Sequence, residues 1–371
     1  MRKPPWLSTN TAKAWSRWRA WRSPPAAMAP LPADTTARIL VANTTGIGDT
    51  IFCTAPIADL RESFPNAEID LFVDRRRLGL VENNPHITRI IIYKGKYKQV
   101  RATIRELRSR AYTVAMIQHV NDPDIVPLIA LGRPQYIVGY RSHTLSRLYS
   151  VALPDVDKRA GVHTLDARLG LCKAIGARGE HWHMELYPAA KARDAAVALL
   201  AEFGLADGQA IALNIGGSAP RKRWPAARWA ELAEALTRRR LPVIVMGGPD
   251  DKVAAAQICA RLKGASGVYS AVARLGLQGD IALLPHCRVH VSGDTGLLHA
   301  GLAQDVPTVA LFGPNEPGWT GPHPRQQQAI VLQPDSGSWP AGYLAGTDKT
   351  GVLMQMISAD QVVAALSALG V

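Results

Sequence analysis

Short apolar runs alternate with amphipathic stretches through the first half of the chain. Runs rich in Ile, Val and Leu predict strands, and stretches with apolar residues on one face predict the helices between them. The predicted strands cover residues 38–42, 69–73, 89–93, 112–117 and 136–139. The predicted helices cover residues 50–63, 99–110, 124–131 and 164–175. Strands that alternate with helices predict a parallel sheet covered on both faces.

The same rhythm restarts after a predicted hinge at Tyr187-Pro188-Ala189. Predicted strands cover residues 210–214, 243–246, 268–269, 289–292 and 308–312. Predicted helices cover residues 226–239, 251–262, 280–284 and 359–369. The last helix starts with Ser358 and Gln361 at the spacing of a capping box. Two successive units of this kind predict an α/β protein with a cleft between its domains, because ligands bind beyond the carboxyl ends of such strands.

These patterns divide the chain into four parts. Residues 34–187 and 188–355 are the two predicted α/β domains, and residues 356–371 are a C-terminal helix. Residues 1–33 stand apart, with six basic residues, no acidic residue and several tryptophans. Tryptophan and arginine on one helix face suit a lipid headgroup layer, so this head is either a membrane-surface helix or a disordered basic tail.

Composition and charge limit the partners that the protein can have. No apolar run is long enough for a transmembrane helix. The net charge of +13 calls for an anionic partner, such as lipid, phosphorylated substrate or nucleic acid. Nucleic acid is not expected, since no motif that reads it accompanies the charge.

The cysteine and acidic patterns give no sign of a metal site. The four cysteines lie far apart without a CxxC pair, which suits a reduced compartment. Two Asp-x-Asp strings, at residues 122–124 and 155–157, are short and common by chance. Helix capping and loop placement explain them, so we expect no bound metal.

The loop after the first predicted strand is the first candidate site. Glycines at Gly46 and Gly48 let the backbone approach a ligand, but neither a P-loop nor a complete dinucleotide fingerprint is present. Asp49 follows them. It is either a general base that takes a proton from an acceptor hydroxyl, or a cap on the next helix.

A second candidate follows the strand predicted at residues 289–292. Thr295 and Gly296 place backbone amides at a helix N-terminus, where a diphosphate could dock. Asp294 either accepts hydrogen bonds from sugar hydroxyls or caps the helix. His299 lies one turn further along, and either points back toward the ligand or is a core histidine.

Two further glycine-containing loops follow strands in the second half. Gly217 and Ser218 offer amides and a hydroxyl, and Lys222 offers a point charge for phosphate. The alternative is a solvated basic loop. Asp251 follows the next strand, where an acidic residue could grip ribose hydroxyls or cap a helix.

Basic residues gather in the first domain. Residues 94–110 hold seven basic residues and one acidic residue. Arg75, Arg76 and Arg141 add positive charge that a phosphorylated glycolipid acceptor could use; a solvated surface is the alternative.

Taken together and in this order, the motifs resemble glycosyltransferase family 9, the lipopolysaccharide heptosyltransferases. The resemblance covers about residues 38–371. The pieces that carry it are residues 39–49, 54–56, 60–61, 64–69, 84–87, 222–225, 247–249, 294–300 and 311–314.

The resemblance implies a GT-B architecture, with two Rossmann-like doubly wound domains facing a central cleft. It implies an inverting enzyme without metal or cofactor, with Asp49 as the base. Lys222 would lie near the donor phosphates beside Gly217 and Ser218. By the same resemblance, Asp251 would contact ribose, Asp294 the donor sugar, and the Thr295 and Gly296 amides the phosphate.

The expected reaction moves heptose from ADP-heptose onto a lipopolysaccharide core or related glycolipid. The protein would then work in the cytoplasm, as a peripheral protein on the inner membrane. Two alternatives stay open: a GT-B enzyme with a different nucleotide sugar, and a non-catalytic, membrane-associated binder of nucleotide sugars.

Overall fold

The computed structural model describes residues 28–120, 122–141, 145–156, 161–262, 267–339 and 351–371. The chain divides into two compact units, Met1–His183 and Met184–Val371. The division falls just before the hinge expected at Tyr187-Pro188-Ala189. Most of the tryptophan-rich head, up to residue 27, lies outside the described residues.

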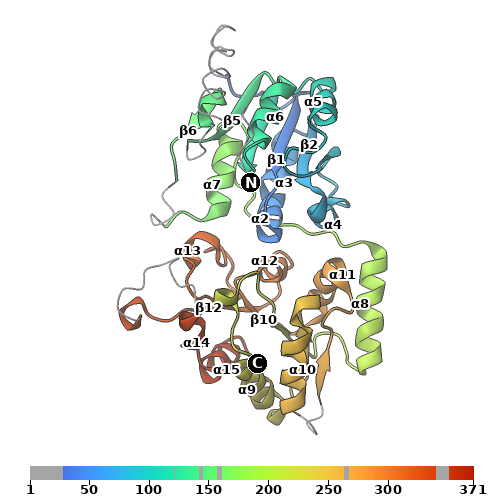
Figure 1. The fold of residues 1–371 in the computed structure, drawn as a ribbon, viewed down its shortest axis with the longest axis vertical. Helices are drawn as coiled ribbons and strands as arrows, with labels where there is room; N and C mark the ends of the chain where they lie inside the picture. Colours follow the sequence, from blue (N-terminus) through green and yellow to red (C-terminus); the bar gives the residue numbers. More distant parts are fainter. Residues whose placement is uncertain (1–27, 121, 142–144, 157–160, 263–266, 340–350) are drawn as a thin grey trace. The chain divides into compact units, whose positions relative to one another are not determined.

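The described part of the first unit holds a six-stranded sheet whose pairings are all parallel (Figure 1). Its strands, in spatial order, are β3 (Arg89–Tyr93), β2 (Glu68–Asp74), β1 (Arg38–Asn43), β4 (Val114–His119), β5 (Tyr136–Tyr140) and β6 (Val151–Leu153). Its helices are α2 (Ile47–Phe52), α3 (Thr54–Ser63), η2 (Arg75–Arg77), α4 (Leu78–Val81), α5 (Val100–Ser109), α6 (Ile125–Gly132), η3 (Ser146–Leu148) and α7 (Thr164–Lys173). Helices α5 and α6 pack together on one face, and α3 packs with α7 on the other.

The second unit repeats this arrangement. Its strands, in spatial order, are β12 (Ala329–Leu332), β11 (Thr308–Leu311), β10 (Val289–Gly293), β7 (Ile211–Asn214), β8 (Val243–Met246) and β9 (Val268–Ser270). Its helices are α8 (Ala190–Phe203), η4 (Pro220–Lys222), α9 (Ala226–Arg238), η5 (Pro249–Asp251), α10 (Lys252–Arg261), α11 (Gly276–Leu283), η6 (Leu284–His286), α12 (Gly296–Leu302), α13 (Pro317–Thr320), η7 (Ser336–Ser338), α14 (Val352–Gln355) and α15 (Ala359–Ala368). Counted along the chain, both sheets have the doubly wound order 3-2-1-4-5-6. The two parallel α/β units expected from the sequence are thus confirmed.

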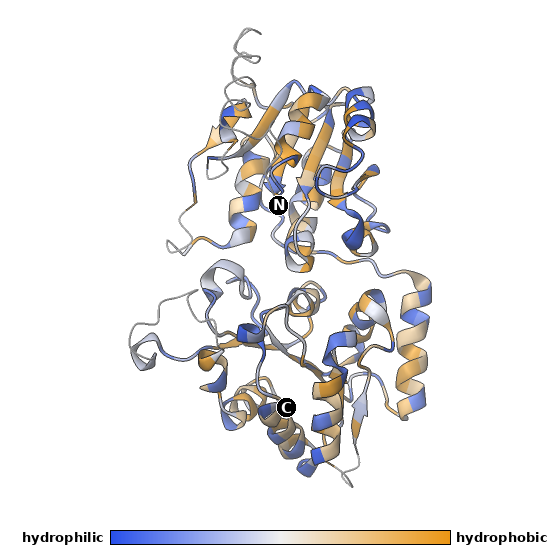
Figure 2. Cartoon of the chain, viewed as in Figure 1, coloured by the Kyte–Doolittle hydropathy of each residue, from blue (hydrophilic) through white to orange (hydrophobic). Residues whose placement is uncertain are grey.

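The core explains why the strands read as continuous apolar runs. Ile39, Leu40 and Val41 of β1 are buried, as a sheet covered on both faces requires. Figure 2 shows the strands of the first sheet as mainly hydrophobic, with hydrophilic residues on the outer helix surfaces. In the second unit, β7, β8 and β10 pack against α9, α10 and α15 around the buried side chain of Trp229.

Two helix predictions need correction. The helix expected over residues 50–63 is broken at Cys53 into α2 and α3. Pro56 has no N–H and its ring clashes with the carbonyl one turn earlier, so a single helix cannot run through it. Helix α8 was missed, although alanines and charged residues along it favour a helix.

The last helix follows its prediction closely. The Ser358 hydroxyl accepts from the Gln361 amide at 3.2 Å, and the Gln361 side chain accepts from the Ser358 amide at 2.8 Å. The capping box expected from the sequence is therefore confirmed, and it fixes where α15 begins.

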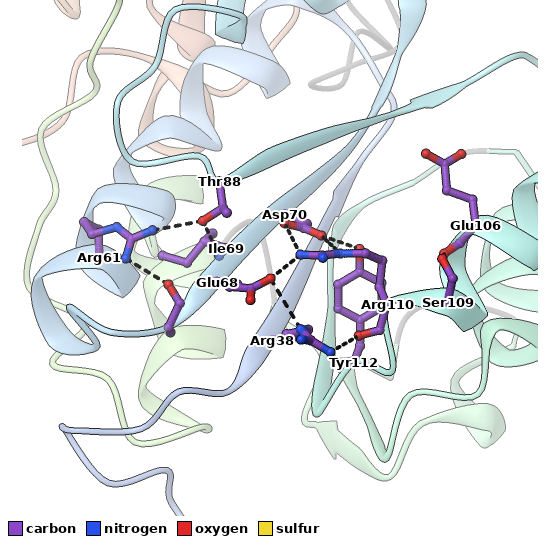
Figure 3. Close-up of polar contacts among 11 residues, drawn as sticks. Arg38, Arg61, Glu68, Ile69, Asp70, Thr88, Glu106, Ser109, Arg110 and Tyr112 are labelled. Carbon is purple, nitrogen blue, oxygen red and sulfur yellow. Dashed lines mark hydrogen bonds and ion pairs between the residues drawn. The ribbon is translucent and has the colours of Figure 1, made fainter.

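A polar cluster closes the amino edge of the first sheet (Figure 3). The Arg110 guanidinium donates to Asp70 at 2.8 Å and also binds Glu68. The Tyr112 hydroxyl donates to the same Asp70 carboxylate at 2.7 Å. Arg38 donates to the Arg110 carbonyl at 3.1 Å. These contacts join the starts of β1, β2 and β4, at the opposite edge from the candidate loops.

Candidate functional site

The loops that carry Asp49, Lys222 and Asp294 lie at the points where the strand order of each sheet reverses. In a doubly wound sheet this switch point opens a crevice at the carboxyl edge, where ligands bind. In the first unit the switch lies between β1 and β4, and the Thr44 amide donates to the His119 carbonyl at 3.1 Å across it. In the second unit it lies between β7 and β10.

Asp49 lies in the first turn of α2, beside the first switch point. Gly46 is the residue at the cap position, so Asp49 is not the N-cap. Its carboxylate accepts from Arg168 at 2.9 Å and lies 3.5 Å from the His119 ring, with one third of the side chain exposed. Burial by itself would raise the pKa of this carboxyl, but the charges of Arg168 and His119 and hydrogen bonds from Thr45 and Gly46 together lower it. Asp49 is therefore an ionised carboxylate that solvent can reach.

Arg168 comes from α7 and is almost fully buried. Besides Asp49, its guanidinium donates to the Asn43 side chain at 3.3 Å and lies 5.9 Å from the centre of the Phe52 ring. Gln118 donates to its backbone carbonyl at 3.4 Å. Because an arginine does not lose its proton in proteins, it is a fixed positive charge behind the carboxylate.

The arginines expected at an acceptor site lie at carboxyl ends of the same sheet. Arg75 and Arg76 form part of η2 directly after β2, and both are exposed. Arg76 is paired with Asp74 at 2.9 Å. Arg141 follows β5 and donates to the Ala152 carbonyl at 3.2 Å. Arg77, the third residue of the same arginine run, donates to the Thr45 carbonyl at 3.1 Å and so joins η2 to the Asp49 loop.

In the second unit, Asn214 bridges the switch point. Its side-chain amide donates to Ser292 and to Thr295, both at 2.8 Å. Thr295 is the N-cap of α12 and Gly296 its first residue, so the amides predicted to meet phosphate do lie at a helix start. The hydrogen bonds from Asn214 hold that start in place.

Lys222 and Asp294 form an ion pair next to this helix start. The ammonium lies 2.7 Å from the Asp294 carboxylate and 3.4 Å from its carbonyl oxygen. Asn315, in the loop after β11, donates to the same carboxylate. The Lys222 side chain is 19% exposed and that of Asp294 is 8% exposed, so the ammonium is the more accessible partner.

The other residues predicted to bind the sugar donor differ in how many of their polar groups are already in contact with other parts of the protein. The Gly217 carbonyl accepts from Arg223 at 2.9 Å, and Ser218 is exposed. Asp251 is buried, with its carboxylate accepting from the Gly248 amide at 2.8 Å and lying 3.3 Å from Arg223. These contacts give Asp251 a structural role in holding the loop after β8.

His299 and Asp124 are buried, whereas Asp155 is exposed in a loop. The His299 ring is buried within the second unit, on α12. Asp124 is buried and accepts from the Tyr93 hydroxyl and the Tyr97 amide, both at 2.8 Å. Asp157 lies outside the described residues. Within the described ranges, no group of three or more His, Cys, Asp or Glu side chains is arranged to hold a metal ion.

Comparison with known proteins identifies the family. A model of glycosyltransferase family 9 (heptosyltransferase) matches residues 137–338, which is more than half of the chain. The chain belongs to glycosyltransferase family 9. The family expected from the sequence motifs is therefore confirmed.

Individual relatives of this family 9 chain are similar over different lengths. Lipopolysaccharide heptosyltransferase 1 of Pseudomonas aeruginosa is 41% identical over 110 residues, which are 29% of each protein. The chain spans about a third of the length of the first curated relatives it matches.

Solved structures match over nearly the whole chain. A family 9 glycosyltransferase from Veillonella parvula has a TM-score of 0.78 at 24% identity, covering 92% of this chain and 99% of its own. The ADP-heptose lipopolysaccharide heptosyltransferase II of E. coli has a TM-score of 0.73 at 22% identity, covering 90% and 98%. These likenesses show the fold and confirm the expected GT-B class.

Sequence reasoning missed several residues of the family 9 chain that contact the predicted ones. Arg168 lies 119 positions from Asp49, and a single arginine on a helix gives no sign of such a partner. The sequence also showed no sign of the contacts that the Asn214 and Asn315 side chains make. Asn214 is the last residue of β7 and Asn315 lies in the loop after β11, and only these places at strand ends could have pointed to them.

Proposed function

We propose that this chain transfers heptose from ADP-heptose to a hydroxyl of a lipopolysaccharide core or related glycolipid, with inversion and without a metal. Family membership supports glycosyl transfer, and the names of the matched relatives support heptose and lipopolysaccharide. The structurally similar heptosyltransferase II of E. coli is named for ADP-heptose, which supports the same donor here.

The observation that carries the proposal is the Lys222–Asp294 pair beside the start of α12. A diphosphate needs positive charge and N–H donors, and the Lys222 ammonium and the Thr295 and Gly296 amides supply both. Asp294 holds the ammonium at 2.7 Å, so the charge is in position before any ligand arrives. Its carboxylate would also accept hydrogen bonds from hydroxyls of the donor sugar.

Asp49 supplies the other half of the reaction in this proposal. The acceptor hydroxyl gives its proton to the Asp49 carboxylate and attacks the anomeric carbon of the donor. The bond from that carbon to the diphosphate breaks, and the charge on the leaving group is held by Lys222 and the amides. Preorganised groups of this kind typically contribute about 3–4 kcal/mol each to the transition state. EDTA is expected to leave the rate unchanged; inhibition that Mn²⁺ reverses would contradict the metal-free route.

Arg75, Arg76 and Arg141 are proposed to meet the anionic acceptor. They lie at the same carboxyl edge as Asp49, and Arg75 and Arg141 are exposed. Phosphate groups of a glycolipid would match their charge.

We place the protein at the cytoplasmic face of the inner membrane as a peripheral protein. Among the described residues, no helix has the length and the apolar composition to cross a bilayer. The basic, tryptophan-rich head at residues 1–33 is the proposed membrane contact. Deleting it should release the protein from sedimented membranes, and unchanged sedimentation would contradict this role.

Thermal stabilisation by nucleotide sugars tests the donor. At one hundred times its Kd, a ligand stabilises the folded state by about 2.7 kcal/mol. ADP-heptose should raise the melting temperature, whereas UDP- and GDP-sugars at the same concentration should not. ADP release from ADP-heptose should then depend on a lipopolysaccharide-core acceptor. Stabilisation by a UDP- or GDP-sugar instead would contradict the proposed donor.

A further inference from the structure

Asp49, Thr45 and His119 form a chain of polar groups at the first switch point. The Thr45 hydroxyl lies 2.9 Å from Nδ1 of His119. A hydrogen bond from the Thr45 side chain is one of the causes that lower the pKa of the Asp49 carboxyl. Nδ1 also lies 3.5 Å from Asp49 Oδ1. The hydroxyl can thus donate one hydrogen bond and accept another between a carboxylate and an imidazole.

Asp49 is poorly placed to keep a proton. The buried guanidinium of Arg168 donates to its carboxylate at 2.9 Å and cannot move away or lose its charge. A protonated Asp49 would leave that guanidinium without its counter-charge, which is costly for a buried cation. A proton taken from the acceptor therefore needs a route onward.

His119 supplies the outer end of such a route. It is the last residue of β4, and its backbone carbonyl is fixed by the Thr44 amide at 3.1 Å. Its side chain is 45% exposed, so the ring can exchange protons with water. Histidine is the side chain that ordinarily gains and loses a proton near neutral pH.

We propose that Thr45 and His119 relay to solvent the proton that Asp49 takes from the acceptor, an inference that rests on the proposed function. The acceptor O–H bond breaks as the new O–C bond forms, and the proton goes to Asp49. Asp49 passes it to the Thr45 oxygen while the Thr45 hydroxyl proton moves to His119 Nδ1. The imidazolium then releases its Nε2 proton to water. Exchange with water returns the remaining ring proton from Nδ1 to Nε2, and rotation of the hydroxyl resets the chain.

The charges around the relay favour this direction. Arg168 from α7 and Arg77 from η2 are the cations near it, and Arg77 donates to the Thr45 carbonyl at 3.1 Å. Both cations disfavour a proton that stays on Asp49 or His119, so the proton is driven outward. Asp49 is the anion that keeps the inner end attractive to a hydroxyl proton.

Removing one link tests the relay. Thr45→Val keeps the shape but removes the hydroxyl, and His119→Gln keeps a hydrogen bond but cannot titrate. Each should lower kcat about 10–100-fold with the KM for ADP-heptose unchanged, as expected for lost acid–base assistance. The double variant should be no slower than either single variant. Thr45→Ser should recover most of the loss, and His86→Gln, at the opposite edge of the sheet, is the control.

Two readouts separate a relay from mere packing. The fall of kcat at acid pH, where the imidazole is protonated, should disappear in His119→Gln. Added imidazole should restore turnover to His119→Ala, but not to His119→Ala combined with Thr45→Val. Melting temperatures near that of the unaltered protein confirm that the variants fold. Loss of kcat with an unchanged pH profile and no rescue by imidazole would overturn the relay.

Asp49→Asn distinguishes this inference from the function beneath it. If Asp49→Asn is inactive while Thr45→Val and His119→Gln turn over normally, the relay is wrong and the base assignment stands. If Asp49→Asn turns over normally, both are wrong. Additive losses in the double variant would also overturn the relay, because independent effects do not share one proton path.

Discussion

In each unit, the segment after the first strand of the sheet carries one partner of an ion pair, but this partner is an anion in the first unit and a cation in the second. In the first unit, Arg168 is 4% exposed behind Asp49, whose side chain is 33% exposed. In the second unit, Asp294 is 8% exposed behind Lys222, whose side chain is 19% exposed. One switch point thus presents a negative group to a ligand and the other a positive group.

In the proposed reaction, two units with the same fold have different roles. Strand order and crevice are the same in both units, so the backbone does not decide the role. The buried partner does: a buried cation keeps a carboxylate ionised, and a buried carboxylate holds an ammonium in place. Substituting a partner of the first pair should therefore affect turnover or stability, whereas substituting Lys222 of the second pair should affect the binding of ADP.

The largest expected effect comes from the exposed anion. Asp49→Asn removes the base but keeps the shape, and it should lower kcat about 10²–10⁴-fold. Binding of ADP, measured by calorimetry, should not change. Asp34→Asn, in an exposed loop of the same unit, is the control. A weaker affinity for ADP in Asp49→Asn would show that the two switch points do not divide the work.

Removing the exposed cation should mainly affect donor binding. Lys222→Met loses a charge-assisted contact with phosphate, worth about 1.5–3 kcal/mol, so the Kd for ADP should rise about 10–100-fold. Lys222→Arg should recover part of the affinity. Lys252→Met, which changes an exposed residue of α10, should bind ADP normally. An unchanged Kd in Lys222→Met would place the phosphates elsewhere.

The buried cation of the first unit should matter for stability and its pH dependence. Arg168→Met leaves Asp49 without its partner and should lower the free energy of unfolding by about 2–3 kcal/mol. The pKa of Asp49 is lowered in the folded protein, so its contribution is present above the ordinary carboxyl pKa and is lost as the pH falls through the folded value. Denaturant unfolding at several pH values should show this dependence weakened in Arg168→Met.

Arg105→Met, on exposed α5, is the matched control for that measurement. Combining Arg168→Met with Asp49→Asn should recover stability, because the double variant no longer contains a carboxylate that lacks a counter-charge. A double variant as unstable as the sum of both single variants would contradict the pairing.

The smallest expected effect comes from titratable groups that lack such partners. In the described part of the second unit, the buried Asp280 has a carboxylate oxygen without a hydrogen bond, and burial raises its pKa to about 7. It stabilises the fold only when protonated, so stability falls as the pH rises toward 7. Asp280→Asn should stabilise the protein by about 1–2 kcal/mol more at pH 8 than at pH 5 in urea unfolding. Exposed Asp250→Asn should show no such difference.

His290 adds the opposite dependence in the same unit. Its buried ring nitrogens have no hydrogen-bond partner among the described residues, and burial lowers its pKa to about 3. Its contribution is present above pH 6.5 and is lost as the pH falls. Urea unfolding of His290→Phe should therefore lose less stability between pH 7 and pH 4 than the unaltered protein, and an equal loss would contradict this assignment.

Local patterns predicted the fold because each strand and most helices carry their own signal. Apolar runs marked the central strands, and the Ser358 box marked the start of α15. The edge strands β6 and β12 were missed. β6 is only three residues long, whereas the Ala-Ile-Val-Leu run of β12 was visible in the sequence. The break between α2 and α3, by contrast, could have been predicted, because Pro56 disrupts a helix locally.

For the candidate site too, the sequence predicted some features and not others. Asp49, Lys222 and Asp294 follow strands, so their position alone marked them. What sets their properties was not visible, since Arg168 reaches Asp49 across 119 positions and Lys222 reaches Asp294 across 72. Such pairs depend on which helix covers which face, and no local pattern contains that information.

The Arg110 cluster at the amino edge has a consequence for how this protein can diverge. It ties β1, β2 and β4 together with charged and phenolic groups at the edge of the sheet opposite the candidate loops. Loops at the far edge can therefore be exchanged, lengthened or randomised without loosening the strand starts. A library that varies residues 94–99 and leaves the cluster intact should yield folded proteins with new acceptor preferences.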